Sequence, residues 1–330
     1  MTLLLVAIAL LIPLSLILLS VYGARVMVRP ARYASEQSAA TFGLAAPATI
    51  ALKARDGLGL IAWWFAADAS PGPVRPSIIV CHGHGADKRA SLWVAADLLP
   101  RYNVLLLDLR GHGESDWATT SVGYIERLDI EGGVDWLLNQ LGPHAIGVLG
   151  ISMGAGAAIQ AAAECPAISA VVADSPFARL TSPVGEVICA RGYPRIVSNV
   201  LAWWVCAIAG WLGQPRGRWR DPIDVVARIA PRPLLLIHGE ADTLIPVHNA
   251  HALYRAAGEP TELWTVPGAG HARVADLDHR AYRERVGAFF DLWLGASSGS
   301  AGEPATPTGA GHGQYVGDRQ LQVVDRSEAS

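Results

Sequence analysis

Three side chains that could act together in acyl transfer lie in turn-forming sequences spread widely along the chain. The first is Ser152, at the centre of residues 150–154, which read Gly-Ile-Ser-Met-Gly and fit a G-x-S-x-G pattern. The pattern follows a short apolar run at 146–149 and precedes a run of small residues typical of a helix. In that context the turn is so tight that the flanking positions must be glycine, and the serine hydroxyl is lifted above the sheet. The pattern therefore predicts Ser152 as a nucleophile.

A serine hydroxyl is a poor nucleophile at neutral pH, so it needs a base, and the base needs an acid that holds it in position. His271 ends the sequence Pro-Gly-Ala-Gly-His, directly after an apolar run at 262–266. Asp242 follows another run, at 234–237, and the chain order serine, aspartate, histidine is typical of one fold in particular. Asp174 also ends a strand-like run and is the alternative acid. We favour Asp242 because the acid of such a triad follows the strand before the histidine's own.

The chemistry also requires backbone N–H groups that stabilise the oxyanion formed during acyl transfer. Residues 82–85 read His-Gly-His-Gly after an apolar run, and their glycines let the backbone turn its amides towards the site. We expect the N–H groups of His84 and Met153 to form this oxyanion hole. Asp87 gives the two histidines a distant likeness to a zinc motif, but it lies one residue too late and a lysine replaces the third ligand. No metal site is predicted, and the chemistry needs no cofactor.

The elements that must position these residues alternate between strand-like and helix-like sequences. Eight short apolar runs, bounded by Gly, Asp or Pro, are typical of strands, and most of them fit strands buried on both faces. They lie at 50–53, 60–65, 77–81, 104–107, 146–149, 170–173, 234–237 and 262–266. Helix candidates lie at 92–99, 125–141, 154–164, 247–257 and 282–294. This alternation predicts an α/β fold with a mostly parallel sheet covered by helices.

Together these motifs make the chain, from about Thr49 to Leu294, similar to members of the α/β-hydrolase superfamily. The resemblance rests on six landmarks in the expected order: His82-Gly83, Asp108–Ser115, Gly150–Gly154, Ala173–Phe177, His238–Asp242 and Gly270-His271. Within the superfamily, the chain resembles bacterial membrane-anchored esterases and serine-aminopeptidase-like members. The resemblance implies an eight-stranded sheet with flanking helices and a helical cap after the sixth strand. It does not fix the substrate, because one fold serves many activities.

A stretch without strand-like runs, at about 177–228, fits the expected cap. Its middle, Ile196–Leu212, is apolar and carries Trp203, Trp204 and Trp211. Its length of 17 residues is borderline for crossing a membrane, so we interpret it as a cap helix over the C-terminal edge of the sheet. The alternatives are a second membrane span and a helix that lies in the membrane interface, where tryptophan is favoured.

The apolar excess of the chain has a clear source at its N-terminus. The chain is 51% hydrophobic and 17% charged, whereas soluble domains carry about 25% charged residues. Leu3 to Tyr22 contains no charged residue and is long enough for a membrane-spanning helix. A cleaved signal peptide is the alternative, but the first two residues supply no basic segment and no A-x-A cleavage site follows. The sequence predicts a single-pass membrane protein. The arginines at 25, 29 and 32 favour a main body in the cytoplasm, and the opposite orientation is the alternative.

The chain divides into four predicted parts. We expect a transmembrane anchor at 1–22, a juxtamembrane connector at 23–45, one hydrolase-like domain at 46–295 and a disordered tail at 296–330. The net charge of −3 gives no electrostatic reason to expect nucleic acid as a partner. Four cysteines in 330 residues form no disulfide framework.

These observations predict a serine hydrolase that cleaves carboxylic esters, with a hydrophobic acyl group indicated by the apolar cap. A peptidase or aminopeptidase would use the same three residues, and the sequence does not separate ester, amide and thioester cleavage. A catalytically silent binding or scaffold protein on this fold is a further alternative, against which the complete triad argues. The expected partners are a small-molecule acyl substrate and, through the N-terminal helix, a membrane.

Overall fold

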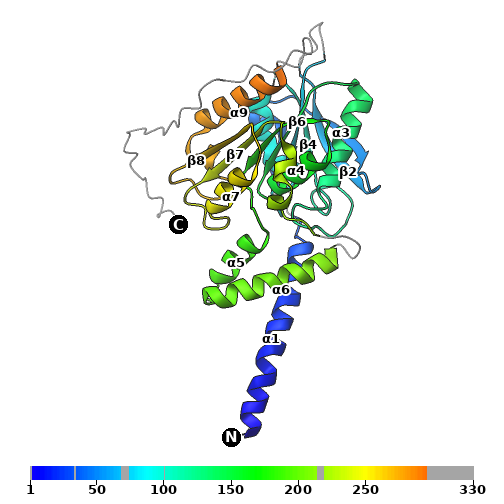
Figure 1. Cartoon of the computed structure of the whole chain (residues 1–330). Helices are drawn as coiled ribbons and strands as arrows, with labels where there is room; N and C mark the ends of the chain where they lie inside the picture. The colour runs from blue at the N-terminus through cyan, green and yellow to red at the C-terminus, as the bar shows by residue number, and fades with distance from the viewer. Residues whose placement is uncertain (1, 33–34, 68–73, 100, 214–218, 296–330) are drawn as a thin grey trace, which may run out of the picture. The chain divides into compact units, whose positions relative to one another are not determined.

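One eight-stranded sheet forms the centre of the structure, a computed structural model that describes residues 2–32, 35–67, 74–99, 101–213 and 219–295. The strands are β1 Ala48–Lys53, β2 Gly59–Phe65, β3 Ser77–Cys81, β4 Asn103–Leu107, β5 Ile146–Ile151, β6 Ile168–Asp174, β7 Leu234–Gly239 and β8 Thr261–Val266. They lie side by side in the order β1-β2-β4-β3-β5-β6-β7-β8 (Figure 1). β2 pairs antiparallel with β1 and β4, and the other neighbouring pairs are parallel. The predicted eight-stranded, mostly parallel sheet is confirmed.

Helices cover both faces of the sheet because its central strands are apolar on both sides. Every residue of β3 and β4 is buried. Ile79 of β3 belongs to one apolar cluster, whereas its neighbour Ile78 belongs to the other. The first cluster is completed by α3 Arg127–Leu141, α4 Met153–Glu164 and α7 His248–Ala256, and the second by α2 Leu92–Leu98 and α9 His279–Leu294.

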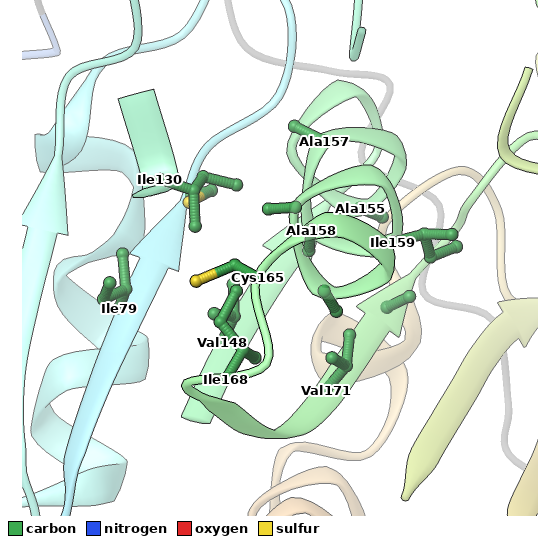
Figure 2. Packing of buried hydrophobic residues seen from close by; sticks show 14 of the residues in the cluster. Ile79, Ile130, Val148, Ala155, Ala157, Ala158, Ile159, Cys165, Ile168 and Val171 are labelled. Atoms are coloured by element: carbon green, nitrogen blue, oxygen red, sulfur yellow. The ribbon is translucent and has the colours of Figure 1, made fainter. Parts of the chain in front are cut away.

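α4 follows β5, a central strand of the sheet, and begins directly after Ser152. Its alanines pack with Val148 of β5 and Val171 of β6 (Figure 2). Small side chains let the helix backbone lie close to the strands, so the turn between β5 and α4 must be short. That turn contains Ser152.

Two helices, α5 Thr181–Cys189 and α6 Arg195–Gly213, follow β6 and precede β7 in the chain, where the sequence predicts a helical cap. α6 matches the predicted apolar helix closely. α5 has only nine residues, and its Pro183 and Gly185 are weak helix formers, so the sequence carries no clear signal for it.

The N-terminal helix α1 Thr2–Val28 extends beyond the charge-free segment that ends at Tyr22. Its last turns pack against α6, and Ala24 and Val28 of α1 are buried there with Val205 and Ala209 of α6. This packing explains why the helix continues into the segment predicted as a connector, since tertiary contacts stabilise a helix that local sequence would end.

The remaining described elements are short: η1 Ala39–Phe42, η2 Lys88–Ser91, η3 Pro222–Asp224, η4 Val226–Ile229 and α8 Val274–Leu277. Among the described side chains, one helical segment, Arg195–Leu212, has the length and composition of a membrane span, and α1 contributes the shorter apolar segment Leu14–Val28. The predicted tail at 296–330 lies outside the described residues.

Candidate active site

Ser152 lies in the turn between β5 and α4 with a positive φ of 56°. A Cβ atom on Gly150 would lie 2.1 Å from the carbonyl oxygen of Gly154, and one on Gly154 would lie 2.3 Å from that of Cys81. Both distances are too short for a side chain, so only glycine fits at positions 150 and 154. The Ser152 N–H donates to the carbonyl oxygen of Asp174 at 2.8 Å and ties the turn to β6.

The folded chain brings His271 and Asp242 to Ser152, although the three residues are far apart in sequence. His271 Nε2 lies 2.9 Å from Ser152 Oγ, and His271 Nδ1 lies 2.7 Å from Asp242 Oδ2. When Nδ1 donates its proton to the carboxylate, Nε2 is left as the acceptor that faces the serine hydroxyl. The three predicted side chains therefore form one continuous chain of hydrogen bonds.

The Asp242 carboxylate is fixed by the turn that follows β7. Its Oδ1 accepts hydrogen bonds from the N–H groups of Leu244 at 2.9 Å and Ile245 at 2.7 Å. Burial by itself would raise the pKa of Asp242, but the hydrogen bonds it accepts from two histidines and from a backbone N–H outweigh burial and hold that pKa well below its usual range. Asp242 is therefore a carboxylate at neutral pH and can stabilise a positive charge on the imidazole.

Asp174, the alternative acid, occupies a different position. Its Oδ1 accepts a hydrogen bond from Ser175 Oγ at 2.9 Å, and burial raises the pKa of Asp174. Ser175 Oγ in turn accepts from the Ala272 N–H at 3.0 Å. Asp174 thus supports the loop next to His271, whereas Asp242 is the carboxylate at hydrogen-bond distance from the imidazole.

The loop at 82–85 passes close to Ser152. A Cβ atom on Gly83 would lie 3.4 Å from Ser152 Cβ, so a side chain at this position would be in contact with the serine. His82 Nε2 accepts a hydrogen bond from the Leu109 N–H at 3.1 Å, and burial lowers the pKa of His82, which keeps the ring in the neutral form that can accept. His82 thereby joins this loop to the loop that follows β4.

His84, one of the two residues predicted for the oxyanion hole, uses its side chain for another contact. Its Nε2 donates to the carbonyl oxygen of Met27 in α1 at 2.9 Å. Its partner in the predicted hole, Met153, is the first residue of α4, and both residues line the same cavity as Ser152. Among the residues that the structure describes, no group of three or more His, Cys, Asp or Glu side chains is placed to hold a metal ion.

Known proteins share this fold and much of this sequence. Residues 76–188 match the family model of the alpha/beta hydrolase fold. YqkD of Bacillus subtilis is 31% identical over 230 residues, which cover 67% of this chain and 73% of YqkD. Rv2307c of Mycobacterium tuberculosis is 31% identical over 246 residues, which cover 73% of this chain and 78% of Rv2307c. The chain belongs to the α/β-hydrolase superfamily.

A solved structure with a stated activity is also similar to this α/β hydrolase. The esterase Pf2001 of Pyrococcus furiosus superposes with a TM-score of 0.67 and 28% sequence identity, over 81% of this chain and 98% of the esterase. The family and this neighbour together indicate a hydrolase, which takes a small-molecule substrate.

A cavity of about 440 Å³ opens at Ser152 of this α/β hydrolase. Beside Ser152 it is lined mainly by apolar side chains from three helices, α1, α5 and α6. The α6 residues in its wall are Leu201 and Val205, whereas Trp203, Trp204 and Trp211 are exposed and lie outside the wall. The tryptophans that mark the cap in the sequence therefore do not form the cavity.

The α1 and α5 residues in the cavity wall are candidate site residues that no sequence motif predicts. They include Gly23 and Met27 of α1 and Val184 and Ile188 of α5. The apolar residues at 26–28, which follow Arg25 without a helix-breaking residue, are the available signal that α1 continues this far. Their position over Ser152 depends on contacts between parts of the chain that are distant in sequence.

Proposed function

We propose that this α/β hydrolase is a serine esterase that cleaves carboxylic esters with a hydrophobic acyl group. The observation that carries the proposal is the pair of contacts made by His271, 2.9 Å to Ser152 Oγ and 2.7 Å to Asp242 Oδ2. The similarity to Pf2001 supports it, because that protein is an esterase. The apolar lining of the cavity beside Ser152 supports a hydrophobic acyl group.

In the proposed reaction, Ser152 Oγ attacks the acyl carbon while His271 Nε2 accepts the hydroxyl proton. The bond between the acyl carbon and the alkoxy oxygen then breaks, and the leaving alcohol takes the proton from His271. Water attacks the acyl-enzyme by the same route, so that the acid is released and Ser152 regains its proton. Asp242 holds the imidazole in the required tautomer and stabilises its cation.

The negative charge on the acyl oxygen is assigned to the backbone N–H groups of His84 and Met153, each contributing about 3 kcal/mol to the transition state. Two observations support this assignment. Gly83 lets the first loop pass close to Ser152, because it has no side chain, and Met153 begins α4, where backbone N–H groups have no partner within the helix.

The proposal includes a membrane location, with α1 as a single-pass anchor and the hydrolase domain on the cytoplasmic side. α1 has 27 residues and therefore spans about 40 Å, more than the thickness of a hydrocarbon core. Its sequence is free of charge as far as Tyr22, and arginines follow on the side of the main body. Retention of the full chain in the membrane pellet after alkaline carbonate extraction is the expected result, and release into the supernatant contradicts the anchor.

Activity-based labelling tests the proposed chemistry most directly. The full chain, purified in detergent micelles, is expected to react with a fluorophosphonate probe and to hydrolyse p-nitrophenyl butyrate. Ser152→Ala is expected to lose the label and to lower hydrolysis by about 10⁴-fold or more. The control Ser38→Ala changes an exposed serine and should behave as the wild type. Label that persists in Ser152→Ala contradicts the proposal, and faster cleavage of aminoacyl p-nitroanilides than of esters replaces it with a peptidase.

A further inference from the structure

The cavity at Ser152 continues along the N-terminal helix. Its α1 wall includes Leu19, Gly23, Val26 and Met27, which recur every three or four residues and so lie on one face of the helix. From Met27 to Leu19 the helix rises about 12 Å. The cavity is therefore an elongated groove with one helix along its length, a shape that fits an extended chain better than a compact acyl group.

One end of this groove lies at the reaction centre. The Met27 carbonyl oxygen accepts the 2.9 Å hydrogen bond from His84, and both residues line the cavity together with Ser152. Leu19, at the other end, lies within the charge-free segment of α1. The groove thus leads from the nucleophile along the helix towards the proposed membrane anchor.

The mouth of the groove is apolar and exposed. Tyr22 and Val26 of α1 and Val187 of α5 line the groove, yet 68%, 52% and 37% of their surfaces are exposed. Exposed apolar residues at the rim of a cavity are typical of a surface that meets a hydrophobic partner. A water-filled entrance for a polar substrate would not need them.

α6 extends this apolar surface. It packs against α1 through Val205 and Ala209, and it exposes Trp203 and Trp211, whose exposed fractions are 59% and 72%. Tryptophan side chains favour the layer between lipid headgroups and hydrocarbon. The neighbouring face of α1 also exposes Leu18. These residues identify the occupant of the surface as a lipid bilayer, because they adjoin a helix long and apolar enough to enter it.

We propose that the groove between α1 and α5 is an acyl-chain site, and that it takes the long-chain carboxylic ester of a membrane lipid directly from the bilayer. The acyl chain lies along Leu19, Gly23 and Val26, and its carbonyl carbon reaches Ser152 at the Met27 end. The inference rests on the proposed esterase chemistry, whose bond changes it leaves unaltered. It assigns α1 a role in binding the substrate as well as in anchoring the chain.

The first test measures acyl-chain preference in the full chain, in detergent micelles, with p-nitrophenyl acetate and p-nitrophenyl palmitate. Gly23→Trp fills the α1 wall, and Val187→Trp narrows the groove from α5 at an exposed position that tolerates a large side chain. Both variants are expected to lower kcat/KM for the palmitate ester by about tenfold or more and to change that for the acetate ester by less than about twofold. Val74→Trp, at an exposed valine that does not line the groove, is the matched control and should change neither value.

The results separate this inference from the proposed esterase function. Absence of Ser152-dependent acetate hydrolysis contradicts the esterase itself. Wild-type acetate and palmitate hydrolysis in both groove variants overturns the acyl-chain site and leaves the esterase intact. An equal loss on both esters in Val187→Trp also overturns it, because the residue would then act on the reaction centre and not on the chain.

The second test distinguishes a bilayer source from a soluble carrier of the same acyl chain. The full chain in phosphatidylcholine vesicles is given either 1-palmitoylglycerol within the vesicles or palmitoyl-CoA in solution. We expect the vesicle-borne ester to be cleaved faster, and Trp203→Ser with Trp211→Ser to lower that rate severalfold while p-nitrophenyl acetate hydrolysis is unchanged. Faster cleavage of palmitoyl-CoA, with no effect of the tryptophan substitutions, overturns the bilayer source.

Discussion

The two sides of the Ser152 cavity are built in different ways. The catalytic side consists of loops that directly follow strands of the sheet, and its side chains are held by hydrogen bonds to nearby backbone groups, as Asp242 is by Leu244 and Ile245. The helical side consists of α1, α5 and α6, which meet through apolar side chains such as Ala24 and Val205. In the first arrangement each side chain is placed by the turn next to it, and the second depends on contacts between distant parts of the chain.

This difference predicts that the catalytic side sets the rate of ester cleavage and that the helical side sets which acyl chain is preferred. A change on the catalytic side should slow the cleavage of every ester, because it alters groups that contact the reacting atoms. A change on the helical side should alter the choice of acyl chain, since apolar contacts discriminate chain length without taking part in proton transfer. Three predictions test this difference: the first concerns the catalytic side, the second compares the two sides, and the third concerns the attachment of the helical side.

The largest effect is expected on the catalytic side from Asp242→Asn. An amide there can donate to His271 Nδ1, which places the imidazole proton on Nε2, where it faces Ser152 and prevents the ring from acting as a base. We expect kcat/KM for p-nitrophenyl butyrate to fall by about 10³- to 10⁴-fold. Asp174→Asn is the matched control. Since Asp174 bonds to Ser175, whereas the His271 imidazole bonds to Asp242, this variant should lose less than about tenfold. A larger loss than that of Asp242→Asn would reverse the assignment of the acid.

Glycines on the two sides give the second comparison. In Gly154→Ala the new Cβ would lie 2.3 Å from the Cys81 carbonyl oxygen, a backbone atom that cannot move freely, so we expect the free energy of unfolding to fall by about 3 kcal/mol. In Gly23→Ala the nearest atom is the Val205 side chain at 3.4 Å, and alanine is the better helix former by about 1 kcal/mol. Circular dichroism melting in detergent should therefore show a lower Tm for Gly154→Ala and an equal or higher Tm for Gly23→Ala. An equal change of Tm in both variants would contradict the expected difference in packing between the catalytic side and the helical side.

The smallest effect concerns the attachment of α1. The Arg32 guanidinium, just beyond α1, donates to the carbonyl oxygens of Gly111, Gly113 and Ser115, and it lies 4.0 Å from the centre of the Trp117 ring. Arg32→Ala should lower the free energy of unfolding by about 1–3 kcal/mol and reduce palmitate hydrolysis more than acetate hydrolysis. Arg32→Lys should not restore either property, because lysine cannot reproduce the planar set of donors.

Arg29→Ala is the control for this prediction, since Arg29 is exposed and the substitution removes the same charge. It should leave both ester activities and the Tm unchanged. If both alanine variants lose ester activity and Tm to the same extent, the charge near the anchor matters and the hydrogen bonds of Arg32 do not.

Much of the fold follows from the sequence because the strands have strong local signals. Each of the eight strands is a short apolar run with a turn residue at its end, and all eight are present in the sheet. Helix boundaries are less well predicted. α9 begins at His279, ahead of the predicted Tyr282, because the Asp278 side chain accepts a hydrogen bond from the Ala281 N–H and caps the first turn.

The candidate residues follow from the sequence for a similar reason. Each predicted residue of the hydrogen-bonded chain stands next to a tight turn at the carboxyl end of a strand, and parallel strands bring those ends to one edge of the sheet. The residues that line the proposed acyl-chain site lack such a signal. Val184 and Ile188 lie in a short helix with a proline and a glycine, and Gly23 lies in a segment whose composition is that of a connector.

The sequence by itself determined three candidate residues, a serine, an aspartate and a histidine. Each of them is placed by a local turn after a buried strand. Only the tertiary structure decided which carboxylate approaches His271 and which helices cover Ser152. The physical reason is range. Backbone turns and strand burial depend on a few neighbouring residues. The groove, in contrast, is formed by α1 and α5, which are more than a hundred residues apart in the chain. Apolar packing and the hydrogen bond from His84 to Met27 hold this side of the cavity over Ser152.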